Sequence, residues 1–316
     1  MNISFEGALL SPPGPESELG PAGQPKPLSA SDASPADRSS RFSSLLNRSG
    51  APGRRIAFGL GPADNRQARE SVAAALKAGY RHLDTAPVHG HEKGVGRAIR
   101  EAGDHCGLSR AEICVGTTLP PDSHSYDAAL ATCEKSLDRL GLEWIDLLLL
   151  NWPAHHRDRP QETWKAMARL KRDGLAGAIG VINCPPGQVD VLVAETGERP
   201  AVNQLELNPY RQGCDFCLAM ELRAVPVEAR SPFGDLSLND PLFLKLAVKH
   251  GRTPAQIVLR WHLECGRGAV SMATTPRLMR ENLTVFDFRL DVEDMRRIAL
   301  LDRAHSPGLG RFSLHA

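Results

Sequence analysis

Two side chains that can do acid–base chemistry stand five positions apart near a short apolar segment. Asp84 follows residues 80–83, which we expect to form a buried strand. A carboxylate there is costly unless another group compensates its charge, so Asp84 is a candidate for chemistry; the alternative is that it only caps the next turn. His89 follows in the loop 87–90, and an imidazole exchanges protons near neutral pH. The pair predicts a proton-transfer site in which the carboxylate orients the imidazole.

The elements that position this pair form a regular alternation of strands and helices from Arg55 onward. Each expected strand is followed by a helical pattern, and every crossover is too long for a hairpin. This order predicts an α/β fold, a parallel (β/α)8 TIM barrel. A doubly wound sheet is the alternative, but the first turn, residues 59–62, lacks its GxGxxG pattern. The eight expected strands are residues 56–60, 80–83, 112–117, 144–150, 177–182, 202–207, 226–229 and 269–272.

A TIM barrel carries its functional residues at the carboxyl ends of its strands. The residues at or next to those ends should therefore ring one mouth of the barrel. They are Asp84, Thr118, Asn151, Asn183, Gln204, Arg230 and Met272.

Composition is that of an ordinary globular chain of 316 residues, 41% hydrophobic and 24% charged, with a net charge of +1. We expect no nucleic-acid partner and no membrane partner. We also expect that the protein is a cytoplasmic monomer and that its substrate is a small molecule. Seven scattered cysteines indicate reduced thiols. Cys214 and Cys217 form the only CxxC; without a second pair we expect no metal there, only the beginning of a helix.

The chain divides into two parts by composition. Residues 1–44 are rich in Pro, Ser, Gly and Ala and poor in large apolar side chains, which predicts a flexible tail. Residues 45–316 are expected to form the barrel.

Several segments resemble the aldo-keto reductase family. GYRHLDTAPVHGHEKGVGRAI (79–99) is similar to the family's GYRHIDTAxxYGNExxVGxAI, and PAVNQLELNPY (200–210) to PAVNQIELHPY. LDRLGLEWIDLLLLNWP (137–153) and GAIGVINC (177–184) also resemble family motifs. The pattern is most similar to bacterial 2,5-diketo-gluconate reductase-like members, and it implies a barrel that binds NADPH across its mouth and reduces carbonyls.

The resemblance also implies a catalytic tetrad, which is degraded here. The family uses a tyrosine as the acid, a lysine paired with an aspartate, and a histidine that orients the substrate. Asp84 is retained, but His89 replaces the tyrosine, Thr118 the lysine and Asn151 the histidine. Arg230 replaces the aromatic residue that stacks on nicotinamide, and we expect it to reach towards Asp84, which lacks its usual lysine.

Of the positions that contact the cofactor in the family, some keep the family's residue and others do not. The lysine, serine and arginine that receive the 2′-phosphate are replaced by Met272, Ala273 and Leu278, and a phosphate needs cationic donors. We therefore expect no NAD(P)H or only weak binding. Residues that match the family's other cofactor contacts, weak or vestigial here, are Asn183, Gln204, Ser231, Glu281 and Asn282.

These substitutions leave three hypotheses for function. The first is a repurposed barrel that uses Asp84, His89, Asn151 and Arg230 for non-redox acid–base chemistry on a small metabolite, such as a cyclisation, elimination or isomerisation. The second is an NAD(P)H-dependent carbonyl oxidoreductase with His89 as the proton donor. The third is a non-catalytic protein that binds a small molecule or a partner.

Overall fold

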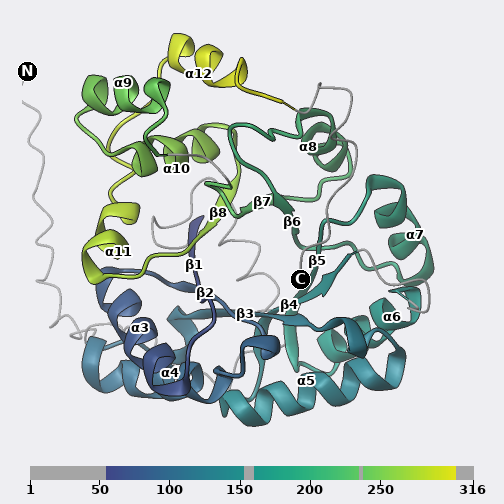
Figure 1. Cartoon of the computed structure of the whole chain (residues 1–316). Helices are drawn as coiled ribbons and strands as arrows, with labels where there is room; N and C mark the ends of the chain where they lie inside the picture. The colour runs from purple at the N-terminus through teal and green to yellow at the C-terminus, as the bar shows by residue number, and fades with distance from the viewer. Residues whose placement is uncertain (1–54, 153–159, 235–237, 304–316) are drawn as a thin grey trace, which may run out of the picture.

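Eight parallel strands close into a barrel surrounded by helices (Figure 1). The structure, a computed structural model, describes residues 55–152, 160–234 and 238–303. The barrel closes because β1 pairs with β8, Ile56 opposite Ala269, which confirms the predicted (β/α)8 fold. The strands are β1 (Ile56–Gly59), β2 (His82–Asp84), β3 (Cys114–Leu119), β4 (Ile145–Asn151), β5 (Ala176–Ile182), β6 (Asn203–Glu206), β7 (Val227–Arg230) and β8 (Gly268–Ser271).

Helices connect successive strands and cover the outside of the barrel. In the described residues these are α3 (Asn65–Ala78), α4 (Glu92–Cys106), α5 (Tyr126–Leu140), α6 (Pro160–Arg172), α7 (Pro186–Thr196), α8 (Cys214–Glu221), α9 (Pro241–His250), α10 (Pro254–Glu264), α11 (Pro276–Leu283) and α12 (Val292–Ala299). Short 3-10 helices lie at η2 (Pro87–His89), η3 (Arg110–Glu112) and η4 (Pro121–Ser123).

Local sequence explains where the first helix begins and ends. Asp64 accepts a hydrogen bond from the Gln67 amide at 2.8 Å, and the Gln67 side chain accepts one from the Asp64 amide at 3.1 Å, a capping box. Gly79 ends α3 with φ 114°, a left-handed conformation that glycine adopts cheaply. The chain then enters β2 at His82, two residues before Asp84.

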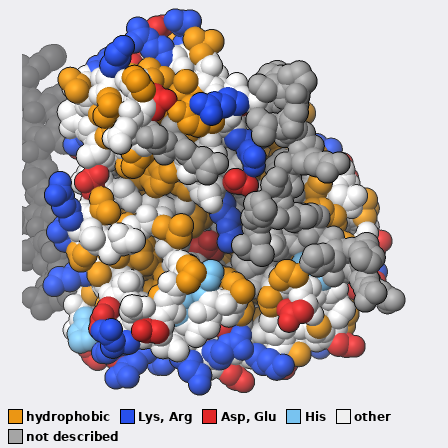
Figure 2. Space-filling model, in the orientation of Figure 1, with side chains coloured by type: hydrophobic (Ala, Val, Ile, Leu, Met, Phe, Trp, Pro, Cys, Tyr) orange, Lys and Arg blue, Asp and Glu red, His pale blue; other side chains and the backbone are white. Residues whose placement is uncertain are grey.

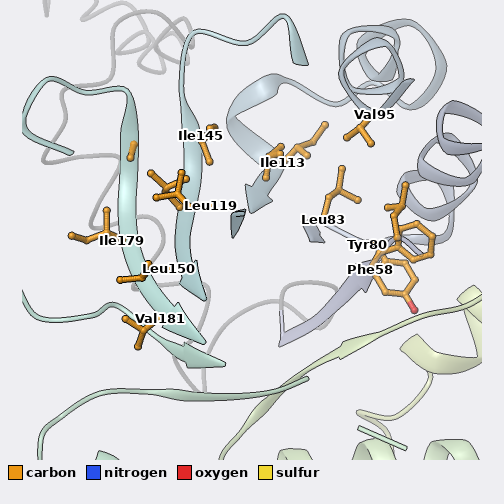
Figure 3. Packing of buried hydrophobic residues seen from close by; sticks show 14 of the residues in the cluster. Phe58, Tyr80, Leu83, Val95, Ile113, Leu119, Ile145, Leu150, Ile179 and Val181 are labelled. Atoms are coloured by element: carbon orange, nitrogen blue, oxygen red, sulfur yellow. The ribbon is translucent and has the colours of Figure 1, made fainter. Parts of the chain in front are cut away.

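The main apolar core lies between the strands and the helices (Figure 3). Phe58 and Tyr80 meet edge to face with ring centroids 5.5 Å apart, and Leu83 and Val95 belong to the same buried cluster. Tyr80 was expected in β2, which the structure begins at His82; the ring nevertheless lies in this core. In β2, Leu83 therefore faces the helices, and His82 and Asp84 face the barrel interior.

Strand register identifies the interior positions. Asp84 lies opposite Gly59 and Gly116, and Gln204 lies opposite Ile182 and Glu228. Partners in register point to the same side of a sheet. Part of the interior is apolar, and its buried cluster comprises Cys114, Leu147, Leu149, Ala178, Ile182 and Val202. The polar interior positions are His82, Asp84, Thr118, Asn151, Gln204, Glu206, Glu228 and Arg230.

Two predictions concern residues that the structure does not describe. The tail 1–44 and the beginning of the barrel part, residues 45–54, both lie outside the described residues. Within the described ranges, no helix combines the length and the apolar character of a membrane span.

Candidate active site

Asp84 is held inside the barrel at the carboxyl end of β2. Its side chain is buried, and burial raises the pKa of the carboxyl, while the Arg230 guanidinium offsets part of that rise. Glu228 adds to the rise, whereas His82 and the Gln204 amide reduce it. The Arg230 charge therefore offsets part of the cost of burying Asp84, although the two side chains form no direct ion pair within the described chain.

Space for these polar groups comes from glycines on neighbouring strands. A Cβ at Gly116 would lie 3.5 Å from Asp84 Oδ1, and one at Gly268 would lie 3.4 Å from Glu228 Oε1. A Cβ alone would make ordinary van der Waals contact with each carboxylate, but a larger side chain would have to occupy the same space. The sequence therefore keeps room in the barrel interior for charged groups rather than for another apolar layer.

Glu228 is a buried acid to which the sequence analysis assigned no role. It accepts a hydrogen bond from Gln204 Nε2 at 2.9 Å, and its Oε1 lies 3.6 Å from Nδ1 of His82. Burial raises its pKa to about 7, which hydrogen bonding to Gln204 and the charge of Arg230 partly oppose. A glutamate in the middle of a four-residue strand between Pro226 and Pro232 was the signal that could have identified it.

His89 ends the 3-10 turn η2 and lies half-buried at the barrel mouth. Burial lowers the pKa of its imidazole, and Arg230 lowers it further. Its ring stacks on His91 with centroids 5.3 Å apart and an interplanar angle of 17°. His91 is itself fixed by a 2.9 Å hydrogen bond between its Nε2 and Thr85 Oγ1. His91, the residue just before α4, therefore positions His89.

Arg230 brings the separate sequence candidates together. It ends β7, and its charge affects the pKa values of Asp84, His89 and Glu228. Thr118 is a buried interior residue of β3, and Asn151 is the half-buried last residue of β4. Both are uncharged, so Arg230 rather than either of them is the positive charge that acts on both Asp84 and His89.

The residues expected near nicotinamide lie on neighbouring strands. Asn183 follows β5 in a left-handed conformation, φ 53°, and its Oδ1 accepts a hydrogen bond from the Glu206 amide at 3.2 Å. Gln204 presents a buried Oε1 that has no hydrogen-bond partner in the described residues. Ser231 directly follows Arg230, is exposed and has φ 52°. An unpartnered buried acceptor next to Asn183 fits the amide group of a nicotinamide ring.

The residues expected near adenosine have different environments. Asn282 is buried, and its Nδ2 donates to Ser271 Oγ at 2.7 Å. Glu281 accepts a 2.7 Å hydrogen bond from Thr253 Oγ1, which ties α11 to α10. Met272 is 63% exposed and Leu278 is 38% exposed, so both present apolar side chains to solvent at the expected phosphate positions.

The surface near the barrel carries charges of both signs beside apolar side chains. Figure 2 shows basic and acidic side chains next to each other near the centre of the face that Figure 1 presents. Charges of both signs also meet inside the barrel, where Arg230 acts on Asp84 and Glu228. A site of this kind suits a polar ligand better than a purely apolar one.

This barrel belongs to the aldo/keto reductase family, whose sequence model matches residues 55–303. The chain is 38% identical over 248 residues to an aldo-keto reductase of Mycobacterium sp. strain KMS, covering 78% of this chain and 88% of that protein. It is 34% identical over 256 residues to the methylglyoxal reductase DkgA of Salmonella typhimurium, covering 80% and 91%. A Bombyx mori aldo-keto reductase solved in complex with NADP aligns with a TM-score of 0.74 and 32% identity, covering 79% and 89%.

These comparisons correct two predictions. The hypothesis of a repurposed non-redox enzyme is wrong, because family, relatives and structural neighbours are reductases. The expectation of no or weak NAD(P)H is also wrong, because a neighbour of the same fold holds NADP. Both predictions were based only on the side chains that differ from the family motifs. Loss of phosphate-binding cations weakens discrimination between cofactors, but it does not remove the rest of the site, including Asn183 and Gln204.

Proposed function

We propose that this protein is an NAD(P)H-dependent carbonyl reductase in which His89 donates the proton and Arg230 replaces the family's catalytic lysine as the cation. The observation that carries the proposal is the joint position of His89 and Arg230 at the barrel mouth, where the guanidinium influences the imidazole. The substrate class is a small aldehyde or ketone. The reductase named for methylglyoxal among the relatives supports this class.

The side chains have complementary tasks in such a reaction. When bound, NAD(P)H supplies a hydride for the carbonyl carbon. Protonated His89 donates its proton to the carbonyl oxygen, which becomes a hydroxyl. Arg230 stabilises the negative charge that develops on that oxygen, and it is oriented by the nearby charge of Asp84. The lowered pKa of His89 makes its protonated form a stronger acid.

The cofactor's amide would be held by Asn183 and Gln204. The Oδ1 of Asn183 is already used by the Glu206 amide, which leaves its Nδ2 as a donor. The buried Oε1 of Gln204 is an acceptor without a described partner. One donor and one acceptor match the two hydrogen-bonding groups of a carboxamide.

Consumption of NADH or NADPH in the presence of methylglyoxal tests this function. The wild type should oxidise the cofactor, and His89→Phe, which keeps a ring but has no proton, should lower turnover about 10²–10⁴-fold. Tight cofactor binding in both proteins would show that the loss is chemical. Undiminished turnover in the Phe variant would exclude His89 as the donor.

A further inference from the structure

Three cysteines lie on the helices beside the segments that lead into β7 and β8, at the end of the barrel opposite the mouth. Cys214 is the first residue of α8, and Cys217 follows one turn later. Cys265 caps the carboxyl end of α10, just before β8. Cys214 and Cys265 both raise the pKa of Cys217, and Cys214 also raises the pKa of Cys265, which indicates that the three side chains are near one another. The CxxC motif is therefore part of a cluster that includes a cysteine about fifty residues away in sequence.

The cluster opens onto a cavity of about 370 Å³. Cys217 and Cys265 line this cavity together with Arg267 and the chain that leads into β7. Cys214 and Cys265 are exposed, and Cys217 is half-buried. A small solute can therefore reach the thiols without passing through the mouth of the barrel.

Arg267 fixes a positive charge beside the thiols. Its guanidinium lies over Trp261, 4.6 Å from the ring centroid, and Nη1 donates to the Gln212 carbonyl at 3.1 Å. The same nitrogen lies 3.8 Å from Cys217 Sγ. Burial raises the pKa of both the Cys217 and the Cys265 thiols, and the Arg267 charge opposes that rise. Both pKa values remain above the usual value for cysteine, but Arg267 keeps the rise smaller than burial alone would make it and so leaves more of the reactive thiolate.

We propose that these three cysteines form a redox-active thiol site, in which hydrogen peroxide oxidises Cys217 and either Cys214 or Cys265 to a disulfide. One thiolate attacks a peroxide oxygen, which breaks the O–O bond and gives a sulfenic acid and, after protonation, water. The second thiol attacks that sulfur, forms the S–S bond and releases a second water. Two thiols and one peroxide give one disulfide and two waters.

A bond between Cys214 and Cys217 requires only a small movement of the helix end. Side chains three apart on a helix have Cβ atoms about 5–6 Å apart, whereas a disulfide requires about 3.5–4.5 Å. Cys214 lies in the exposed first turn of α8, where a helix end deforms at low cost. A metal is a weaker explanation, because in the described residues no three His, Cys, Asp or Glu side chains are arranged to hold one.

Thiol titration and peptide mapping of the full chain after hydrogen peroxide test the proposal. The wild type should lose two free thiols and show one intramolecular disulfide that includes Cys217, reversed by dithiothreitol. Cys217→Ser should lose none, whereas Cys106→Ser, a half-buried cysteine outside the cluster, should still lose two.

The double variant Cys214→Ser/Cys265→Ser changes only exposed positions and leaves Cys217 without a partner. It should also form no intramolecular disulfide, so the proposal stays testable if Cys217→Ser does not fold. A disulfide elsewhere, a bond only between chains, or unchanged thiol loss in these variants would overturn it.

Discussion

Glu228 Oε1 lies 3.6 Å from His82 Nδ1 inside the barrel, and neither side chain has exposed surface. This contact joins β2 to β7, strands that are not neighbours in the sheet. It brings a second acid within electrostatic reach of Asp84. The interior of this barrel therefore contains a titratable group in addition to its candidate catalytic residues.

Glu228 should make stability fall as the pH rises. Its pKa is raised to about 7 in the folded chain, so the folded state binds more protons than the unfolded state between about pH 4.5 and 7. This contribution is present below that window and is lost as the pH rises through 7. Glu228→Gln should reduce the loss of unfolding free energy between pH 5 and 8 by about 2–3 kcal/mol, measured by urea denaturation. The exposed Glu70→Gln is the control and should leave the loss unchanged.

Replacing His89 by tyrosine should move the pH range of reduction. In the wild type, kcat/KM should fall as the pH rises through a value below the usual 6.5 of histidine, because the pKa of His89 is lowered. A phenol stays protonated to about pH 10, so in His89→Tyr the decline should begin at alkaline pH. The same acidic decline in both proteins would place the proton donor elsewhere.

Removal of Arg230 should give two separable effects. Arg230→Met should lower turnover about 10²-fold, because the charge on the carbonyl oxygen loses a stabilising cation. The pH at which kcat/KM declines should rise, since Arg230 lowers the pKa of His89. Arg66→Met removes an exposed cation of α3 that is paired with Glu70 and should change neither quantity. Lower turnover without a shifted pH profile would contradict the proposed coupling.

Cofactor preference should be weak. Met272 and Leu278 offer no cation to a 2′-phosphate, so calorimetry should give dissociation constants for NADH and NADPH within a few-fold of each other. Met272→Lys/Leu278→Arg should tighten NADPH about 10- to 100-fold and leave NADH unchanged. Strong NADPH preference in the wild type would point to the neighbouring exposed Arg277 or Arg280 as the phosphate ligand.

Close packing between two helices gives a matched pair of stability variants. A Cβ on Gly96 of α4 would lie 1.7 Å from the Leu140 carbonyl oxygen, whereas one on Gly103 would meet nothing nearer than 3.8 Å. Gly96→Ala should lower the free energy of unfolding by several kcal/mol, because the backbones of α4 and α5 must move apart. Gly103→Ala should stabilise by about 0.5–1 kcal/mol through helix propensity. Thermal unfolding of both variants measures the difference.

Local patterns were sufficient to predict most of the fold. The continuous apolar run 144–150 is typical of a strand covered on both faces, and the structure has β4 there. Gly79 and Gly141 adopt positive φ at the ends of α3 and α5, as glycine commonly does after a helix. The barrel rule then placed Asp84 and Arg230 at one mouth before any distance was known.

The parts that were missed depend on contacts distant in sequence. The burial of Glu228 follows from its register with Gln204 and its approach to His82, which lies 146 positions earlier. The role of His91 depends instead on local side-chain contacts, a stack against His89 and a hydrogen bond with Thr85, which strand and helix patterns do not predict. The cofactor prediction failed because it weighed each substituted side chain by itself and not the site that remains.

Pairing of Ile56 with Ala269 has a consequence for synthesis of the chain on the ribosome. The first strand cannot meet its final neighbour until more than two hundred further residues have been made. Throughout that time the growing sheet has open edges, which are able to pair with other nascent chains. Dependence on chaperones during translation should therefore end only when β8 and the helices after it have left the exit tunnel.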